Sequence, residues 1–219
     1  MFKAAIFDWD GTLADTKEVI IASFQMALRE INCSPDSKVI ERLIGIGSSQ
    51  TFREILRIEN ISFDEQLIDS LVRIKVKNSI ELSKEIKLFK GSKDLLMILK
   101  DKIKLGLASM NKREFIDNLL KRLELADVFD VVVTADEITK SKPDPEIFAK
   151  CLKELFVKPE KCCIFEDSIF GVRAAKSIGV SCIAVLTGAY NKMEITAEAP
   201  DLIVTSLNEK QKIWKFLFQ

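Results

Sequence analysis

Two aspartates stand one residue apart near the N-terminus, in the segment FDWDGT. Asp8 and Asp10 directly follow the apolar run 4–7 and precede Gly11. Strand ends avoid unpaired like charges, and a helix cap needs one acid rather than two. A hard cation removes the repulsion, and Mg²⁺ binds one or two carboxylates together with waters and a substrate phosphate. The pair therefore predicts a Mg²⁺ site rather than a helix cap.

Polar side chains follow three further apolar runs in the same way. Ser109 follows KLGLA, Lys142 lies in a loop after the next apolar run, and Glu166 and Asp167 follow CCIF. Each has an ordinary explanation alone, as a turn serine, a surface lysine or a loop acid. Ligands of an open parallel sheet bind beyond the carboxyl ends of its strands. We therefore expect these residues to meet in one crevice, with Mg²⁺ between Asp8 and Asp167.

This set of side chains suits phosphoryl transfer. A carboxylate can attack phosphorus to form an aspartyl phosphate, and the transfer needs little beyond positioning and charge neutralisation. Asp8 is then the nucleophile, and Lys142 and Mg²⁺ supply positive charge. Ser109 and backbone N–H groups near Asp10 and Gly11 would donate to the phosphoryl oxygens. Asp10 would protonate the leaving alcohol and then activate water.

Composition excludes several other kinds of chemistry. The 219 residues include no histidine, which rules out Ser-His-Asp and Cys-His catalysis and histidine-ligated metals. Net charge is zero, so no basic excess indicates nucleic acid or an anionic membrane as a partner. The 5 cysteines form no C-x-x-C pair, and no leader or membrane-spanning segment is evident. We expect a cytoplasmic protein with a small-molecule partner; the sequence carries no signal for its oligomeric state.

The apolar pattern divides the chain into two parts. From residue 88 onward, short apolar runs alternate with helical patterns, at 104–109, 128–134, 161–166, 180–186 and 201–206. Such alternation predicts an α/β domain with a parallel sheet covered on both faces. Residues 16–87 show a helical period instead, beginning with Ile20, Phe24 and Leu28. We predict a core of residues 1–15 and 88–219, with a helical insertion of residues 16–87.

Four segments of the chain resemble the motifs of the haloacid dehalogenase-like phosphatase superfamily, in the right order. They are DWDGTLADT, LASMN, SKPDP and FEDSIFGVRAAKSIGV, and the resemblance covers essentially the whole chain. The resemblance implies a Rossmann-like parallel sheet core with an inserted helical cap, which corresponds to residues 16–87.

The resemblance also implies roles for individual residues. It makes Asp8 the nucleophile and Asp10 the general acid/base, with Ser109 and Lys142 holding the phosphate. Mg²⁺ would be bound by Asp8, Asp10 through its backbone carbonyl, Asp167 and Glu166, the last as an outer ligand. We further assign substrate or phosphate binding to Gly11, Thr12, Asn111, Thr16, Gly47 and Lys77. An exposed lysine and a plain helix–helix turn explain Lys77 and the glycines Gly45 and Gly47 about as well.

Within the superfamily, the chain is similar to phosphoglycolate phosphatases and to β-phosphoglucomutases. The mutases carry a histidine shortly after Thr16, and Ile20 stands near that position here. The resemblance therefore favours hydrolysis of a small phosphorylated metabolite, of phosphoglycolate or sugar phosphate type, through an aspartyl phosphate. A phosphomutase is the alternative. A phosphoacceptor domain that only signals, or a silent binding domain, remains as a third interpretation. Haloalkanoate dehalogenases lack the second aspartate, so the presence of Asp10 argues against dehalogenation.

Overall fold

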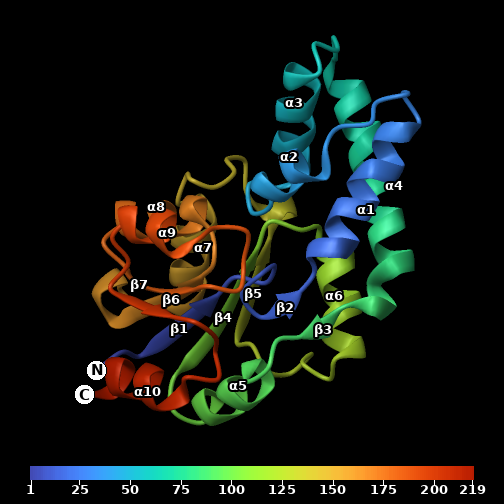
Figure 1. The fold of residues 1–219 in the computed structure, drawn as a ribbon. Coiled ribbons are helices and arrows are strands. Elements are labelled where there is room, and N and C mark those ends of the chain that lie inside the picture. The colour runs from blue at the N-terminus through green and yellow to red at the C-terminus, as the bar shows by residue number, and fades with distance from the viewer.

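A six-stranded parallel sheet forms the centre of the computed structural model, which describes residues 1–219 (Figure 1). Its strands are β1 (Ala4–Phe7), β4 (Lys104–Ser109), β5 (Val131–Thr134), β6 (Cys162–Glu166), β7 (Ser181–Val185) and β8 (Leu202–Val204). Their order across the sheet is β5-β4-β1-β6-β7-β8, and every neighbouring pair is parallel. The predicted α/β parallel-sheet fold is confirmed. After β1 the chain forms β4 and β5 on one side of that strand and then β6, β7 and β8 on the other. This reversal of strand order places a ligand crevice beyond the carboxyl ends of the central strands.

Two layers of helices cover the sheet, because alternate residues of each buried strand point to opposite faces. On one face Phe7 of β1 stacks on Phe165 of β6, with ring centroids 4.3 Å apart. That face packs against α5 (Ser92–Lys100), α6 (Arg113–Arg122) and α10 (Lys210–Phe218). On the other face Ile6 and Ile164 pack against α7 (Glu146–Leu155), α8 (Ile169–Ser177) and α9 (Lys192–Ala197).

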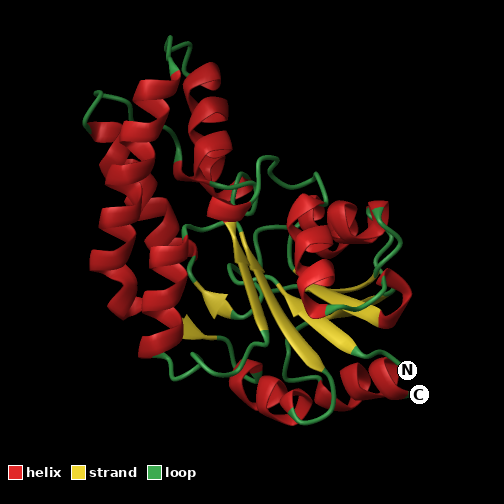
Figure 2. Cartoon of the chain, turned by 180° about the vertical axis from the view of Figure 1, so that it is seen from behind, coloured by secondary structure: helices red, strands yellow, loops and turns green.

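Four helices of the insertion pack on one another beside this core, as Figures 1 and 2 show. They are α1 (Lys17–Arg29), α2 (Ser37–Arg42), α3 (Ser48–Ile58) and α4 (Glu65–Leu82). The predicted stripe of Ile20, Phe24 and Leu28 is buried in a hydrophobic cluster that the insertion forms by itself. The chain enters and leaves through two short antiparallel strands, β2 (Ala14–Asp15) and β3 (Lys87–Leu88).

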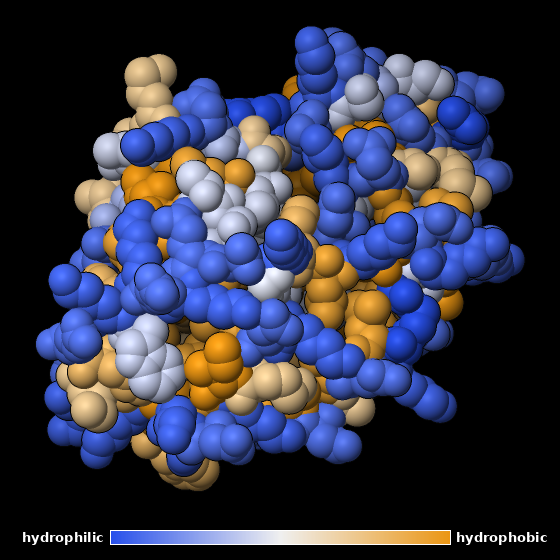
Figure 3. Space-filling model, turned by 60° about the horizontal axis from the view of Figure 1, so that its bottom comes forward, coloured by the Kyte–Doolittle hydropathy of each residue, from blue (hydrophilic) through white to orange (hydrophobic).

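Short 3₁₀ turns complete the chain: η1 (Ser83–Glu85), η2 (Ala135–Glu137) and η3 (Pro159–Lys161). The N- and C-terminal segments lie side by side, since the backbone N–H of Phe2 donates to the carbonyl of Leu217 at 3.1 Å. Figure 3 brings the bottom of Figure 1 forward and shows apolar patches among hydrophilic side chains. Met97, Ile98 and Trp214 are exposed apolar residues of α5 and α10. None of the helices combines the length and apolar character needed to cross a membrane.

Candidate active site

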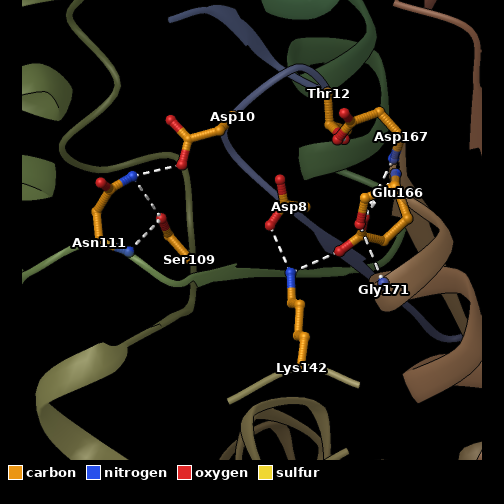
Figure 4. A network of polar contacts seen from close by, with 10 residues as sticks. Asp8, Asp10, Thr12, Ser109, Asn111, Lys142, Glu166, Asp167 and Gly171 are labelled. Atoms are coloured by element: carbon orange, nitrogen blue, oxygen red, sulfur yellow. Dashed lines mark hydrogen bonds and ion pairs between the residues drawn. The ribbon is translucent and has the colours of Figure 1, made fainter. Parts of the chain in front are cut away.

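The predicted residues from four strand ends meet in one buried cluster, shown in Figure 4. Asp8 and Asp10 follow β1, and Ser109 ends β4. Lys142 comes from the loop after β5, while Glu166 and Asp167 stand at the end of β6. All six side chains are buried. Parallel strands in neighbouring positions bring these chain segments together, as the crevice argument requires.

Lys142 is the cation at the centre of the cluster. Its Nζ lies 2.6 Å from Oδ1 of Asp8 and 2.5 Å from Oε1 of Glu166, and only 2% of the residue is exposed. Burial lowers the pKa of Lys142, but the charges and hydrogen bonds of Asp8 and Glu166 outweigh it and raise the pKa above its ordinary value. The ammonium therefore stays charged and fixes the Asp8 carboxylate, whose Oδ2 accepts no hydrogen bond.

Three carboxylates could hold a hard cation here. One oxygen from each of Asp8, Glu166 and Asp167 lies within 4.8 Å of the others. Burial raises the pKa of Asp8 and of Asp167 well above the usual range, and the neighbouring carboxylates raise both further. Lys142 alone does not balance three acids, and carboxylate oxygens suit Mg²⁺. The donor set therefore fits the predicted ion.

Glu166 is engaged at both carboxylate oxygens. Its Oε1 binds Lys142, and its Oε2 accepts from the backbone N–H groups of Asp167 and Ser168 at 3.1 and 3.2 Å and from the Ser168 hydroxyl at 3.1 Å. Asp167 instead receives one side-chain bond, from Thr12 Oγ1 to Oδ1 at 2.9 Å. This arrangement leaves Asp8 and Asp167 with freer oxygens than Glu166.

Gly11 is required by the close approach of Asp167. Its φ is +77°, and a Cβ at this position would lie 2.3 Å from Oδ2 of Asp167. The backbone N–H of Gly11 donates to the carbonyl of Ala14 at 3.0 Å. That N–H is therefore committed within the turn, and any donation to a phosphoryl oxygen must come from other backbone N–H groups of this loop.

Asp10 belongs to a second hydrogen-bond network, with Asn111 and Ser109 (Figure 4). The Nδ2 group of Asn111 donates to Oδ2 of Asp10 at 2.5 Å and to the Ser109 hydroxyl oxygen at 3.3 Å. Burial raises the pKa of Asp10, while the nearby Thr16 hydroxyl, the Lys75 charge and the Asn111 amide act in the opposite direction. Oδ1 of Asp10 and Oγ1 of Thr16 are buried and lie near each other, but no well-aligned hydrogen bond reaches either of them. Unpaired buried oxygens are costly, which makes both suited to a polar ligand.

The cap contributes Lys75 rather than the predicted Lys77. Lys77 lies on the exposed side of α4, where it lines a hollow with Lys112 and Asp136. Lys75 is only 2% exposed and donates from Nζ to Oδ1 of Asn111 at 3.3 Å. Burial lowers its pKa to about 8. The prediction missed Lys75, although its spacing of four from Leu71 places it on the buried stripe of the helix.

A small cavity of about 20 Å³ separates the cap from Asp10 and Asn111. Lys75 and Gly47 line it, together with Ile20, the residue near the mutases' histidine position. Gly47 has φ +87° and faces Met110, whose Cε a Cβ there would approach to 2.8 Å. The predicted loop residue Gly47 therefore does border the site, through its backbone.

Comparison with known proteins places this geometry in a family. Residues 5–185 match the model of haloacid dehalogenase-like hydrolases. A phosphorylated carbohydrates phosphatase of Thermotoga maritima is 32% identical over 199 residues, 90% of this chain and 91% of that protein. The β-phosphoglucomutase of Bacillus subtilis is 31% identical over 192 residues, 85% and 84% of the two chains.

A solved structure agrees with the sequence relatives. The crystal structure of β-phosphoglucomutase from Clostridium difficile superposes with a TM-score of 0.87 at 28% identity, over 100% of both chains. The protein belongs to the haloacid dehalogenase-like hydrolase family.

Proposed function

We propose that this protein is a Mg²⁺-dependent phosphatase that hydrolyses a small phosphorylated metabolite, of sugar phosphate or phosphoglycolate type. The proposal rests mainly on one observation: Asp8 and Asp10 stand in the same loop but have different hydrogen-bond partners. Asp8 is fixed by the buried cation Lys142. Asp10 is held by the neutral amide of Asn111 and keeps one buried oxygen unpaired. One carboxylate is thus set for attack and the other for proton transfer.

In the first step Oδ2 of Asp8 attacks phosphorus. A bond forms between this oxygen and phosphorus, and the bond from phosphorus to the leaving oxygen breaks. Asp10 gives its proton to the leaving oxygen, so an alcohol departs and an aspartyl phosphate remains on Asp8. The Ser109 hydroxyl accepts from Asn111, which leaves its own O–H to donate to a phosphoryl oxygen.

In the second step water returns the enzyme to its starting state. The carboxylate of Asp10, now deprotonated, takes a proton from a water that attacks phosphorus. The bond between phosphorus and Asp8 breaks, inorganic phosphate leaves, and Asp10 is again protonated. Mg²⁺, held by Asp8, Asp167 and the backbone of Asp10 with Glu166 behind them, would offset the negative charge of phosphate and carboxylates.

The cap supports the assignment of a small substrate. Residues 16–87 lie over the site, and the small cavity at Asp10 brings Lys75 within reach of a group attached to the phosphate. Closure of such an insertion excludes water and completes the binding site. The relatives named for phosphorylated carbohydrates and for β-phosphoglucomutase point to polyhydroxylated phosphate esters. We place the protein in the cytoplasm, in keeping with 5 cysteines that are all free and buried.

A phosphomutase is the second candidate, because β-phosphoglucomutases are among the relatives. In a mutase, the aspartyl phosphate must pass to a second hydroxyl rather than to water. The side chain near the mutases' histidine position is the buried Ile20, which cannot take part in proton transfer. Hydrolysis is therefore favoured, and a panel of sugar phosphates, with product analysis for both inorganic phosphate and isomerised ester, separates the two.

Trapping of the covalent intermediate tests the mechanism. With p-nitrophenyl phosphate the leaving group needs little acid help, so Asp10→Asn should form the aspartyl phosphate and keep it, whereas Asp8→Asn should form none. Turnover should fall by about 10²–10⁴-fold in Asp10→Asn. Rapid quench and mass spectrometry of the peptide containing Asp8 reports the added phosphoryl group. Asp15→Asn, which alters an exposed carboxylate of the nearby strand β2, is the control.

Finding no adduct in Asp10→Asn while hydrolysis continues would remove Asp10 from proton transfer. Full turnover in Asp8→Asn would refute the nucleophile. Omission of Mg²⁺ from the same assay should abolish turnover of the unaltered protein.

A further inference from the structure

One ion pair alone crosses from residues 16–87 to the rest of the chain. It joins Arg42, the last residue of α2, to Glu194 of α9, with Nη2 2.6 Å from Oε1 and Nη1 3.3 Å from Oε2. The two side chains are 44% and 31% exposed. An isolated exposed ion pair of this kind contributes little to stability. Attachment of Arg42 to the core therefore depends on its other contacts.

Three further contacts hold Arg42 to the core. Its guanidinium lies over the ring of Tyr190, 4.1 Å from the centroid, and its Nη1 donates to the carbonyl of Ala189 at 3.3 Å. The Tyr190 hydroxyl donates to the backbone carbonyl of Arg42 at 2.6 Å. Because Tyr190 is only 4% exposed, water competes poorly for this bond. We call Arg42, Tyr190 and Glu194 the clasp.

The core side of the clasp is also held by contacts within the core itself. The carboxylate of Glu194 also accepts from the backbone N–H of Asn191 at 2.9 Å, as part of the capping box of α9. The Tyr190 ring packs edge-on against Phe170, with centroids 6.1 Å apart. A preorganised partner lowers the entropy lost when Arg42 docks.

The segment that the clasp anchors is part of the active-site wall. Residues 43–47 follow Arg42 directly, and all of them except Ile46 line the cavity at Asp10 and Lys75. The segment contains Gly45 and Gly47, with φ of +105° and +87°, so its own backbone imposes little stiffness. Within the segment, the Thr51 hydroxyl donates to the carbonyl of Leu43 at 3.3 Å, and Ile46 is buried. The clasp adds an anchor to the core at the N-terminal end of the segment.

We propose that the clasp positions residues 43–47 over the active site and holds the cap closed on bound substrate. Arg42 is in this view a positioning residue that touches no reacting atom. The effect on kinetics rests on the proposed phosphatase function, whereas the effect on the ordering of residues 43–47 does not. The two are therefore measured separately.

Hydrogen exchange with mass spectrometry tests the ordering in the full-length protein. Arg42→Ala should speed exchange about tenfold in peptides that cover residues 41–50, and leave peptides of the cap interior at 52–58 unchanged. Tyr190→Phe, which keeps the ring and removes the hydroxyl, should give a smaller increase at the same place. Arg42→Lys should not restore protection fully, because lysine cannot form the bidentate pair.

Steady-state kinetics with p-nitrophenyl phosphate tests the consequence for catalysis. Arg42→Ala should raise KM about tenfold, consistent with lost charge-assisted bonds, and change kcat less than threefold. Glu194→Ala should do the same, and the double variant should be no worse than either single one. The matched control is Arg173→Ala, which removes another paired guanidinium, bonded through two nitrogens to Glu198 and to no residue of the cap.

Each result decides the proposal. Unchanged exchange at 41–50 in Arg42→Ala overturns it, as does an equal rise of KM in Arg173→Ala. A fall in kcat at constant KM would make Arg42 part of the chemical step and would also overturn it. If the unaltered protein fails to hydrolyse any phosphate ester, the proposed function falls, but the exchange experiment still tests the clasp.

Discussion

Asn111 donates its side-chain amide N–H to Asp10 at 2.5 Å, across 101 positions of sequence. The oxygen of the same amide accepts from Lys75 of the cap at 3.3 Å. A single amide therefore links the proposed acid/base of the core to a buried cation of the cap. Both amide ends are fixed by these bonds, so the orientation of Asp10 depends on whether the cap is in place.

Lys75→Met should for this reason impair catalysis, whereas Lys77→Met should not. The first change removes the donor to Asn111 and a positive charge near Asp10, and leaves an apolar side chain of similar length. We expect kcat/KM for p-nitrophenyl phosphate to fall by about 10–100-fold, the usual cost of removing a bond to a charged network. Lys77 points outward from the same helix and is the internal control. Equal losses in the two variants would show that Lys75 acts only through stability of the cap.

Much of the architecture can be predicted from the sequence, because buried helices and strands have characteristic spacings of apolar residues. Strands with both faces covered are continuous apolar runs, and the run 104–109 corresponds to β4 at both ends. The run 128–134 was expected to be one strand, but β5 begins at Val131. At Asp130 the backbone N–H donates to the carbonyl of Leu105 at 2.8 Å, but the N–H of Leu105 donates to the Asp130 carboxylate at 2.7 Å rather than to a backbone carbonyl. Hydrogen bonding of that kind is invisible to an apolar pattern.

The core of the site was predictable because its residue types are unusual at strand ends. The sequence predicts Asp8, Lys142 and Asp167 as site residues, and the three lie together in the structure. The cap residues of the site are harder to predict, because the face of α4 that meets the active site depends on how the cap packs against the core. The clasp was not predicted at all. Arg42 and Glu194 are 152 positions apart, and neither stands in a motif.

Lys142→Met should destabilise the fold, since it leaves Asp8 and Glu166 buried without their cation. Loss of one partner of a buried pair costs about 3–5 kcal/mol, and we expect the free energy of unfolding to fall by this order. Denaturant unfolding measures the change, with Lys140→Met as control. Lys140 lies in the same loop, 71% exposed and 3.7 Å from Asp144, so its loss should be nearly neutral. Equal stability of both variants would mean that Lys142 does not neutralise the buried acids.

Added Mg²⁺ should recover part of the stability lost in Lys142→Met, because a ligand that binds the folded state stabilises that state.

Gly11→Ala should weaken Mg²⁺ binding as well as the fold. Alanine at φ +77° is strained, and its Cβ would collide with the Asp167 carboxylate, which must then move. Gly179→Ala is the matched control: φ is +70°, but no atom lies within 4 Å of the added Cβ. Both variants should lose about 1 kcal/mol of stability from backbone strain. Only Gly11→Ala should bind Mg²⁺ less tightly, by at least tenfold in calorimetry. Equal Mg²⁺ affinity of the two would show that the position of Asp167 does not matter for the ion.

Tyr190 is the single tyrosine of the chain, so its ionisation can be read directly from tyrosinate absorbance. Burial raises its pKa to about 12 in the folded protein, although the Arg42 charge acts in the opposite direction. An unfolded tyrosine ionises near about 10. Between these two pH values the unfolded chain binds fewer protons than the folded one, so stability falls as pH rises.

Tyrosinate absorbance after a rapid pH jump should therefore show a midpoint near pH 12 for the native protein, and denaturant midpoints should decline above about pH 10. Titration of the native protein near 10 would mean that the hydroxyl is open to water, and hence that the Arg42 carbonyl is not seated on the core in solution. The same measurement on Arg42→Ala then separates the two influences: loss of the cation alone would move the pKa upward, while opening of the cap would move it down toward 10.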